Sequence, residues 1–261
     1  MQPPNVERHS NTPHLPRLIA EIGNNHLGDV ERAREMLAEV LAAGVDAVTF
    51  QVREPRFYQK AEMAHLKLSG DFFEEAASLV HGAGRHFGVA ICDASLVPVL
   101  DTLGVDFWKT LSWDFRNEEL RTALHRTRKP VFYSTGVSGM DDIVEGSRGL
   151  RNAVLIHTQL SDKLCDVNLK AIRSMERETA LPVAFGLHCN NHEVLNLALA
   201  FEPHALFFYV KVSGIPAYDD GHAIALDRLA GTVNNLKELM PAVGTGIKLS
   251  MDTPAWVQAS K

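Results

Sequence analysis

The stretch LIAEIGNNHLGDVERAREMLAEVLAAGVDAVTFQV, residues 18–52, contains one complete unit of the pattern that decides the fold. Its two ends, residues 18–23 and 47–52, are short and apolar, which is typical of parallel strands that helices cover on both faces. Between them, residues 30–44 carry apolar side chains at helical spacing, and Gly44 ends that segment. The stretch therefore predicts a strand, a helix and a second strand parallel to the first.

The same alternation continues along the chain. The further strands that we expect are residues 88–93, 107–112, 131–135, 153–158, 182–187 and 205–212. The helical patterns are residues 72–84, 118–126, 166–178, 192–200 and 226–239, and another helix is expected to begin near Gly139. Eight strands with helical segments between most of them match the (β/α)8 or TIM barrel, which typically takes about 250 residues. An open, doubly wound α/β sheet is the alternative.

We therefore predict a single-domain (β/α)8 barrel over residues 18–240. Residues 1–17 are expected to form a flexible N-terminal arm, and residues 241–261 a C-terminal tail. The formal net charge is −6 with a pI near 6.0, so the chain lacks the basic footprint of a nucleic-acid-binding protein. No run reaches the roughly 18 apolar residues of a membrane span.

The three cysteines, Cys92, Cys165 and Cys189, are widely spaced and contain no Cys-x-x-Cys pair. This spacing argues against a disulfide framework and against a structural zinc site. We expect a cytoplasmic protein without nucleic-acid or membrane partners. A barrel of this kind is also expected to form a homo-oligomer, through a surface that the sequence does not identify.

A carboxylate inside an apolar strand, Glu21, indicates function, because a buried charge needs charged or hydrogen-bonding partners. In a TIM barrel the active site lies at the carboxyl ends of the strands. Polar side chains gather at those ends in the predicted strands and the loops after them. They are Asn25, His26, Gln51, Arg53, Asp93, Lys109, Ser112, Asp114, Ser134, Thr135, His157, Gln159, His188 and Lys211. Ordinary loop polarity explains any one of these positions, but a site explains the set better.

Lys109 lies inside the apolar segment FWKTLS. A lysine there is interpreted as a clamp for a phosphate or carboxylate, as a Schiff-base nucleophile, or as a side chain that reaches the rim. Lys211 has the same three interpretations. The turn STG at 134–136 offers hydroxyl and N–H groups that suit a phosphate.

The segment HCNNH at 188–192 has two further interpretations. Two histidines at i and i+4 on one helical turn can share a metal ion. The segment instead straddles a strand end and a helix start, where an asparagine before Glu193 suits a helix cap. The residue spacing leaves both open.

Several motifs together resemble the sialic acid synthase family. They are AEIGNNHLGD (20–29), AGVDAVTFQ (43–51), KTLS (109–112), STG (134–136), DVNLKAI (166–172) and HAIAL (222–226). The resemblance covers about residues 18–238. It implies a barrel transferase of carbohydrate biosynthesis that condenses phosphoenolpyruvate, as co-substrate, with an N-acetylated amino sugar to make a nonulosonic acid. We expect this chain to lack the family's C-terminal antifreeze-like domain.

The resemblance also implies roles for single residues. Glu21, Asn25 and His26 match the family's first-strand motif, and Gln51 matches a glutamine near the sugar. The matches on later strands are Lys109 and Ser112 with phosphoenolpyruvate-binding residues, Ser134 with a phosphate-contacting serine, Asp114 with a glutamate near the sugar, and His157 with a sixth-strand histidine. Asp219, Asp220 and His222 fall in a loop that closes the site.

The chain departs from the family pattern at several places, two of which concern charge and metal binding. The second-strand lysine is Thr49, and Arg53 is the nearest replacement for its charge. Neither metal-binding histidine is present, so a divalent metal, Mn²⁺ or Mg²⁺, is doubtful as a cofactor. Either Lys211 holds the acceptor oxygen, or His188 and Cys189 rebuild a metal site with Glu21, or the synthase reaction is lost.

We predict a divergent synthase of this family, with Glu21, Lys109, Asp114 and His157 as the catalytic candidates. The substrate-binding candidates are Asn25, His26, Gln51, Arg53, Asp93, Ser112, Ser134, Thr135, Gln159, His188, Lys211 and His222. A metal-independent Schiff-base aldolase or lyase on the same barrel is one alternative. A non-catalytic relative that binds an anionic sugar or a partner is the other. The acceptor sugar is not determined by the sequence.

Overall fold

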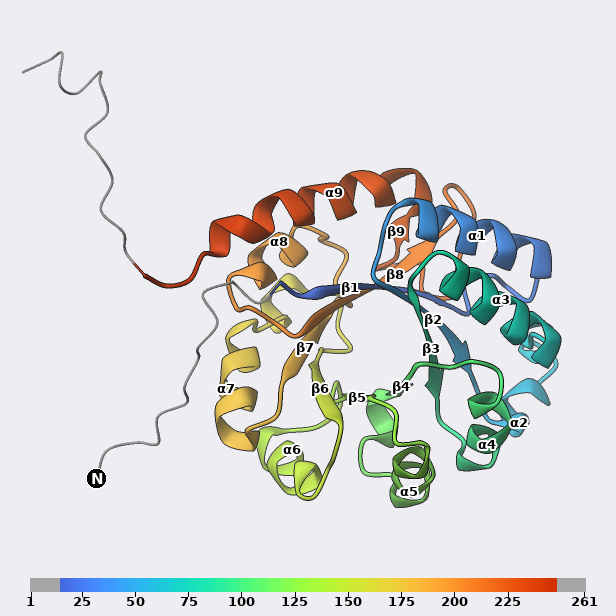
Figure 1. The fold of residues 1–261 in the computed structure, drawn as a ribbon, viewed down its shortest axis with the longest axis horizontal. Coiled ribbons are helices and arrows are strands. Elements are labelled where there is room, and N and C mark those ends of the chain that lie inside the picture. The colour runs from blue at the N-terminus through green and yellow to red at the C-terminus, as the bar shows by residue number, and fades with distance from the viewer. Residues whose placement is uncertain (1–14, 248–261) are drawn as a thin grey trace, which may run out of the picture.

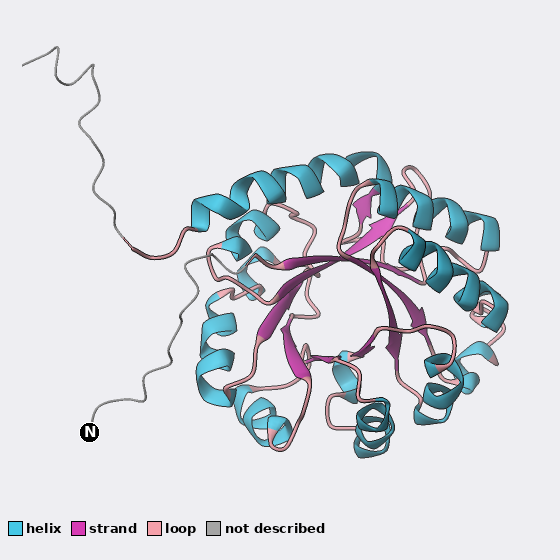
Figure 2. Ribbon diagram, viewed as in Figure 1, coloured by secondary structure: helices cyan, strands magenta, loops and turns pink. Residues whose placement is uncertain are grey.

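A closed ring of eight parallel strands forms the centre of the molecule (Figures 1 and 2). The computed structural model describes residues 15–247. The strands are β1 (Arg17–Gly23), β2 (Ala47–Val52), β3 (His86–Ile91), β4 (Phe107–Thr110), β5 (Val131–Ser134), β6 (Ala153–His157), β7 (Val183–Gly186) and β8 (Ala205–Lys211). Each pairs with the next, and β8 also pairs with β1, which places Glu21 opposite Tyr209. This last pairing confirms the barrel and excludes the open sheet.

Helices surround the strands on the outside (Figure 2). They are α1 (Val30–Ala42), α2 (Pro55–Tyr58), α3 (Gly70–Gly82), α4 (Val97–Asp101), α5 (Glu118–Thr127), α6 (Met140–Ser147), α7 (Lys170–Thr179), α8 (Val194–Leu199) and α9 (Leu226–Val243). Four single 3₁₀ turns, η1 (Ala64–Leu66), η2 (Ala94–Leu96), η3 (Ser112–Asp114) and η4 (Leu164–Asp166), and the two-residue β9 (Ile224–Ala225) lie in the loops. The last helix, α9, packs against both α1 and α8 and so completes the outer layer.

Local sequence explains where the longer helices begin. Asp29 caps α1 by accepting a hydrogen bond from the N–H of Arg32 at 3.1 Å, and Ser69 and Asn117 cap α3 and α5 in the same way. The sequence pattern does not predict the short helices α2 and α4, because four or five residues are too few to show a helical period.

The ends of the domain can be compared only in part with the expected boundaries. The first strand begins at Arg17 and α9 ends at Val243, three residues beyond the expected limit. Residues 1–14 and 248–261, which make up most of the expected arm and tail, lie outside the described residues.

Alternation along the strands decides which side chains enter the barrel. One buried cluster, which includes Ile19, Phe107, Phe132 and Phe207, fills the interior. A separate, larger cluster contains their strand neighbours and packs against the helices. Glu21, Lys109, Ser134 and Tyr209 follow these four interior residues by two positions, so they continue the interior row toward the carboxyl ends.

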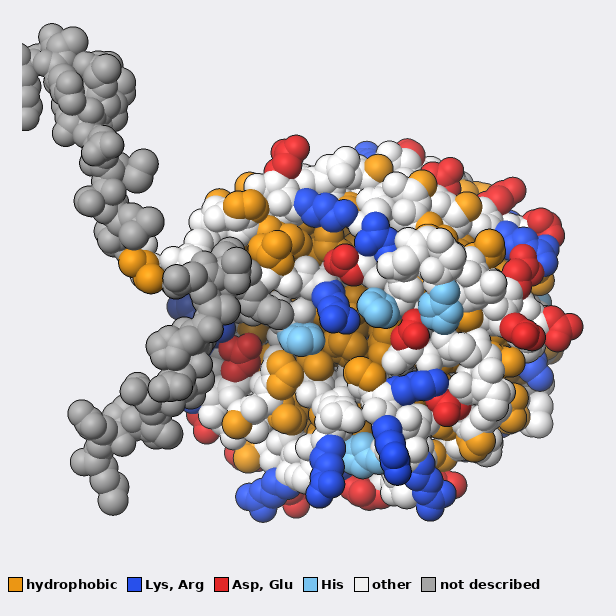
Figure 3. All heavy atoms as spheres, viewed as in Figure 1, with side chains coloured by type: hydrophobic (Ala, Val, Ile, Leu, Met, Phe, Trp, Pro, Cys, Tyr) orange, Lys and Arg blue, Asp and Glu red, His pale blue; other side chains and the backbone are white. Residues whose placement is uncertain are grey.

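On the face shown in Figure 3, lysines and arginines are interspersed with acidic side chains. Within residues 15–247, no helix has the length and apolar character that crossing a membrane requires.

Candidate active site

A buried ion pair joins two strands that are not neighbours in the ring. The ammonium of Lys109 on β4 donates to Oε2 of Glu21 on β1 at 2.5 Å, and their side chains are 6% and 3% exposed. The ammonium also lies 5.5 Å from the ring centre of Tyr209 and 5.6 Å from that of Phe207. Burying either charge alone would be costly. The ion pair therefore explains why a glutamate and a lysine can both lie in apolar strands.

Hydroxyl groups line the rim beside this pair. Ser112 and Ser134 share a hydrogen bond of 2.9 Å between their Oγ atoms, and both are buried. The Oγ1 of Thr158 is also buried and has no hydrogen-bond partner among the described residues. A side chain at Gly136 would place its Cβ 2.7 Å from Ser112 Oγ, so only glycine leaves this strip open. Hydroxyl donors next to an ammonium suit a phosphate or carboxylate.

Three aromatic rings stand on the other side of the pair. The ring centres of His188 and His222 are 4.4 Å apart, and those of Tyr209 and His222 are 4.9 Å apart. Burial, with Lys109 adding to it, lowers the pKa of His188 to about 3 and that of His222 to about 4. Both imidazoles are therefore neutral at pH 7. Burial and the Glu21 charge raise the pKa of Tyr209 well above its ordinary value, so its hydroxyl stays protonated.

The loop after β8 folds back over these rings. Asn25 fixes it, because its Nδ2 donates to the carbonyl of Val210 and its Oδ1 accepts from the N–H of Asp219, each at 2.8 Å. Gly23 has φ +57°, and a Cβ there would lie 2.9 Å from the Tyr209 ring. Burial and the Glu21 charge raise the pKa of Asp219 to about 7, against the opposing effect of Lys109. The predicted closing loop thus places one carboxyl group over the pair.

Two histidines do not join the interior group. His157 follows the interior residue Ile156 by one position, so it points out to the helix layer. Its Nε2 lies 2.8 Å from the carbonyl of Val167, and burial lowers its pKa. His26 accepts from the N–H of Gly28 at 2.9 Å, and its burial lowers its pKa to about 4. Strand alternation therefore places the predicted catalytic candidate His157 away from Lys109 and Glu21.

Three further predicted residues serve local structure at the rim. Thr135 donates its hydroxyl to the carbonyl of Ile156 at 2.8 Å, and Asp93 accepts from the backbone and hydroxyl of Ser95 at the start of η2. Gln159 is exposed beyond β6 and borders a surface cavity. None of these contacts brings the side chain to Lys109.

The two additional cations are also engaged elsewhere. Arg53 pairs with Glu54 at 3.1 Å and lies over the Phe57 ring at 4.2 Å, so it does not replace the missing lysine at Thr49. Lys211 pairs with Asp220 at 2.8 Å in the closing loop.

Two predicted sugar contacts, Gln51 and Asp114, are buried near the rim. Gln51 continues the interior row of β2, which begins with Ala47 in the interior cluster. Asp114 accepts from Asn117 at 3.1 Å through Oδ1, while its Oδ2 is buried without a partner among the described residues. Burial raises the pKa of Asp114 above its ordinary value.

The residues present do not fit a metal ion. Within residues 15–247, no three His, Cys, Asp or Glu side chains are placed to hold one. Cys189 belongs to the buried cluster against the helices, and its thiol meets the carbonyl of Asn191 at 3.6 Å. His188 points to the opposite face, toward Tyr209. The two candidate metal ligands, His188 and Cys189, therefore point to opposite faces of the chain.

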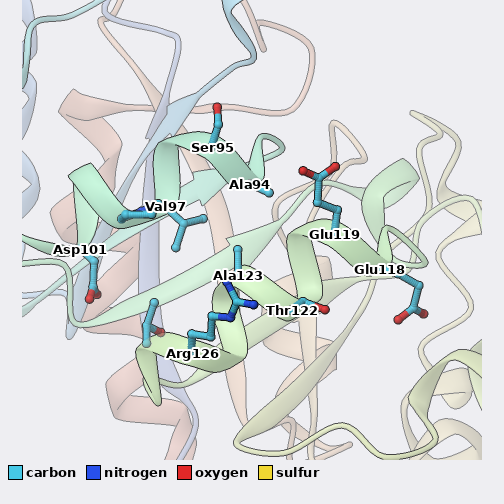
Figure 4. A pocket seen from close by; sticks show the side chains of 11 residues that line it. Ala94, Ser95, Val97, Asp101, Glu118, Glu119, Thr122, Ala123 and Arg126 are labelled. Carbon is cyan, nitrogen blue, oxygen red and sulfur yellow. The ribbon is translucent and has the colours of Figure 1, made fainter.

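A large surface cavity lies apart from all these residues. It measures about 650 Å³ and lies between α4 and α5, where Asp101, Glu118 and Arg126 line it (Figure 4). None of the predicted site residues borders it. Its size therefore does not identify the site.

The NeuB family matches residues 56–248 of this chain. The chain belongs to the NeuB family. This confirms the resemblance to the sialic acid synthases.

Named relatives agree with this assignment. The human N-acetylneuraminate-9-phosphate synthase is 24% identical and covers 88% of this chain and 72% of its own length. An N,N'-diacetyllegionaminic acid synthase of Legionella pneumophila is 24% identical, covering 93% and 77%. An uncharacterized protein of Methanocaldococcus jannaschii is 28% identical, covering 90% and 74%.

Solved structures support the fold. The N-acetylneuraminic acid synthetase of Leptospira borgpetersenii, determined in complex with citrate, superposes with a TM-score of 0.83 at 22% identity and covers 99% of this chain and 95% of its own. A truncated 3-deoxy-D-arabino-heptulosonate 7-phosphate synthase of Thermotoga maritima reaches 0.72 at 13% identity, covering 94% of each chain. These two likenesses concern the barrel alone.

Proposed function

We propose that this NeuB-family chain condenses phosphoenolpyruvate with the aldehyde of an N-acetylated amino sugar or a related acceptor. C3 of phosphoenolpyruvate bonds to the aldehyde carbon, the aldehyde oxygen takes up a proton, and water supplies the oxygen of the new keto group as phosphate leaves. The product is a 2-keto-3-deoxy sugar acid. The observation that carries this proposal is the buried Lys109–Glu21 pair with Ser112 and Ser134 beside it.

We assign anion binding to side chains at the carboxyl ends of β4 and β5. Lys109 supplies the positive charge, and Ser112 and Ser134 supply hydroxyl donors on neighbouring strands. A ligand carboxylate or phosphate would compete with Glu21 for the ammonium, which charge-assisted hydrogen bonds make favourable. Glu21 would then be free to accept a proton from the acceptor or from water.

Proton transfer to the acceptor oxygen falls to groups that hold a proton near neutral pH. Asp219, whose pKa burial raises to about 7, and Tyr209 both lie against the pair. A general acid works best when its pKa is near the working pH. We therefore assign proton donation to Asp219, and to Asp114 only a contact with the acceptor. No step is assigned to a metal, because within residues 15–247 no three His, Cys, Asp or Glu side chains are placed to hold one.

The Schiff-base alternative finds less support. A lysine that attacks a carbonyl must be a free amine, but Lys109 is paired with a carboxylate at 2.5 Å and Lys211 with another at 2.8 Å. Both lysine side chains are therefore engaged in ion pairs. Measuring phosphate release distinguishes the non-catalytic alternative from the synthase.

Phosphate release tests the proposal. Purified full chain is mixed with phosphoenolpyruvate and a panel of aldoses that includes N-acetylated amino sugars, with Mn²⁺ in one series and a chelator in the other. We expect acceptor-dependent phosphate release, loss of at least about a hundredfold in Lys109→Met because the anion loses its cation, and no change in Lys237→Met. Lys237 donates to the carbonyl of Gly44, far from the rim in the chain's outer layer. No release with any acceptor in either series would refute the proposal.

A further inference from the structure

A second pocket lies outside the ring of strands and shares none of the interior residues. It has a volume of about 230 Å³ and is enclosed by α2, the start of α3 and α4. Its walls include Leu68, Phe73 and Leu100, all buried, and Leu103, which follows α4. An apolar cavity of about 150 Å³ in another protein stays dry and binds benzene. This pocket is therefore large enough for one six-membered ring or a branched chain.

The charges on the pocket wall have one sign. Arg53 and Lys67 border the pocket, and no aspartate or glutamate does, although the whole chain has a net charge of −6. Arg53 is already paired with Glu54. Lys67 is exposed, and no carboxylate in residues 15–247 forms an ion pair with it. An anionic group at the pocket would meet an unpaired ammonium.

Two neutral donors also border the pocket. Tyr58 accepts a hydrogen bond from the N–H of Arg53 at 3.0 Å through its hydroxyl oxygen, which leaves its O–H free to donate. Burial raises the pKa of Tyr58, so this proton is retained. The thirteen-residue helix α3 begins at Gly70 on the pocket wall, and its positive end favours an anion, part of which Asp71 in its first turn already supplies.

We propose that this side pocket binds a small carboxylic acid with an aromatic or branched apolar body. The apolar body occupies the space between Leu68, Phe73 and Leu100. The carboxylate meets Lys67, the Tyr58 hydroxyl and the first turn of α3. A neutral molecule would fill the same apolar space but would leave these three donors without a charged partner, so the pocket discriminates by charge as well as by shape.

Calorimetric titration of the full chain tests this assignment. The probes are phenylacetate and 4-methylpentanoate, and phenylacetamide is the neutral match for the first. We expect one equivalent of each acid to bind, and phenylacetamide to bind about tenfold more weakly, the usual effect of losing a charge-assisted hydrogen bond. Lys67→Met should weaken phenylacetate by about threefold to tenfold without changing phenylacetamide.

A blocking variant locates the binding. Val99 borders the pocket and is 63% exposed, so Val99→Trp can cover the opening without disturbing the core. Leu197 on α8 is also 63% exposed and does not border the pocket, so Leu197→Trp is the matched control. We expect Val99→Trp to abolish binding and Leu197→Trp to leave it unchanged.

Three results would overturn the assignment. They are no saturable binding of either acid, equal affinity in Val99→Trp and Leu197→Trp, and equal affinity for phenylacetate and phenylacetamide. Because the readout is binding and not phosphate release, none of these results bears on the proposed synthase reaction.

Discussion

Two glutamate–cation pairs on this barrel differ in separation and in burial. Glu21 and Lys109 come from strands 88 residues apart and are almost completely buried. Glu54 and Arg53 are adjacent in sequence, and their side chains are 21% and 13% exposed. The local pair can form in any extended loop, whereas the interior pair exists only once the ring is closed. Burial of the interior pair therefore depends on the tertiary fold, whereas the local pair shapes only its own loop.

The largest expected effect comes from breaking the interior pair. Lys109→Met leaves the Glu21 carboxylate buried without a cation, which should lower the free energy of unfolding by about 3–5 kcal/mol. Replacing Glu21 by Gln in that variant removes the uncompensated charge and should recover most of the loss. Urea unfolding followed by circular dichroism measures all three proteins. A double variant no more stable than Lys109→Met would contradict the pairing.

A smaller effect concerns the carboxyl group that lies over the interior pair. The pKa of Asp219 is about 7 in the folded protein against an ordinary value of 3.8. Between these two pH values the folded state holds a proton that the unfolded chain has lost, so this group makes stability fall as pH rises, by at most about 1.4 kcal/mol per pH unit. Asp219→Asn removes that contribution.

Two buried histidines also make stability depend on pH, so the effect of Asp219 is measured as the difference between the wild type and Asp219→Asn. The folded pKa values of His188 and His222 lie near 3 and 4, below 6.5, so these groups make stability rise with pH from about 4 to 6.5. Both proteins contain them. Stability curves of the wild type and Asp219→Asn should therefore converge toward pH 4 and separate toward pH 7, with the variant the more stable. Parallel curves would show that Asp219 titrates normally.

The smallest expected effect comes from the local pair. Arg53→Met keeps an apolar chain over the Phe57 ring and removes only a partly exposed ion pair, so it should cost no more than about 1 kcal/mol. The same urea experiment measures it beside Lys109→Met. Equal losses in the two variants would abolish the distinction between the pairs.

The strands could be predicted because each carries its own signal. Short apolar segments covered on both faces, with helical periods between them, indicate parallel β/α units, and eight such units close a ring. The convergence of Glu21 and Lys109 followed from the same reasoning, since the carboxyl ends of all barrel strands meet at one rim. The short helix α4 was missed because five residues hold no readable period.

The site residues were less predictable because one position of alternation changes a side chain's face. Ile156 fills the interior while His157, the next residue, lies against the helices. Cys189 and His188 separate in the same way. Loop residues show no periodicity that would predict where their side chains point. Arg53 was expected at the rim because it follows Gln51 by two residues, whereas its actual partners are Glu54 and Phe57.

The sequence by itself determined the barrel, its family and the end at which polar groups collect, because apolar periodicity and strand polarity are local properties of the chain. Only the tertiary structure decided that Glu21 is held by Lys109, that Asp219 is held by Asn25 over both, and that the supposed metal ligands point apart. These are contacts between side chains far apart in the sequence, and their geometry depends on the register and alternation of strands closed into a ring.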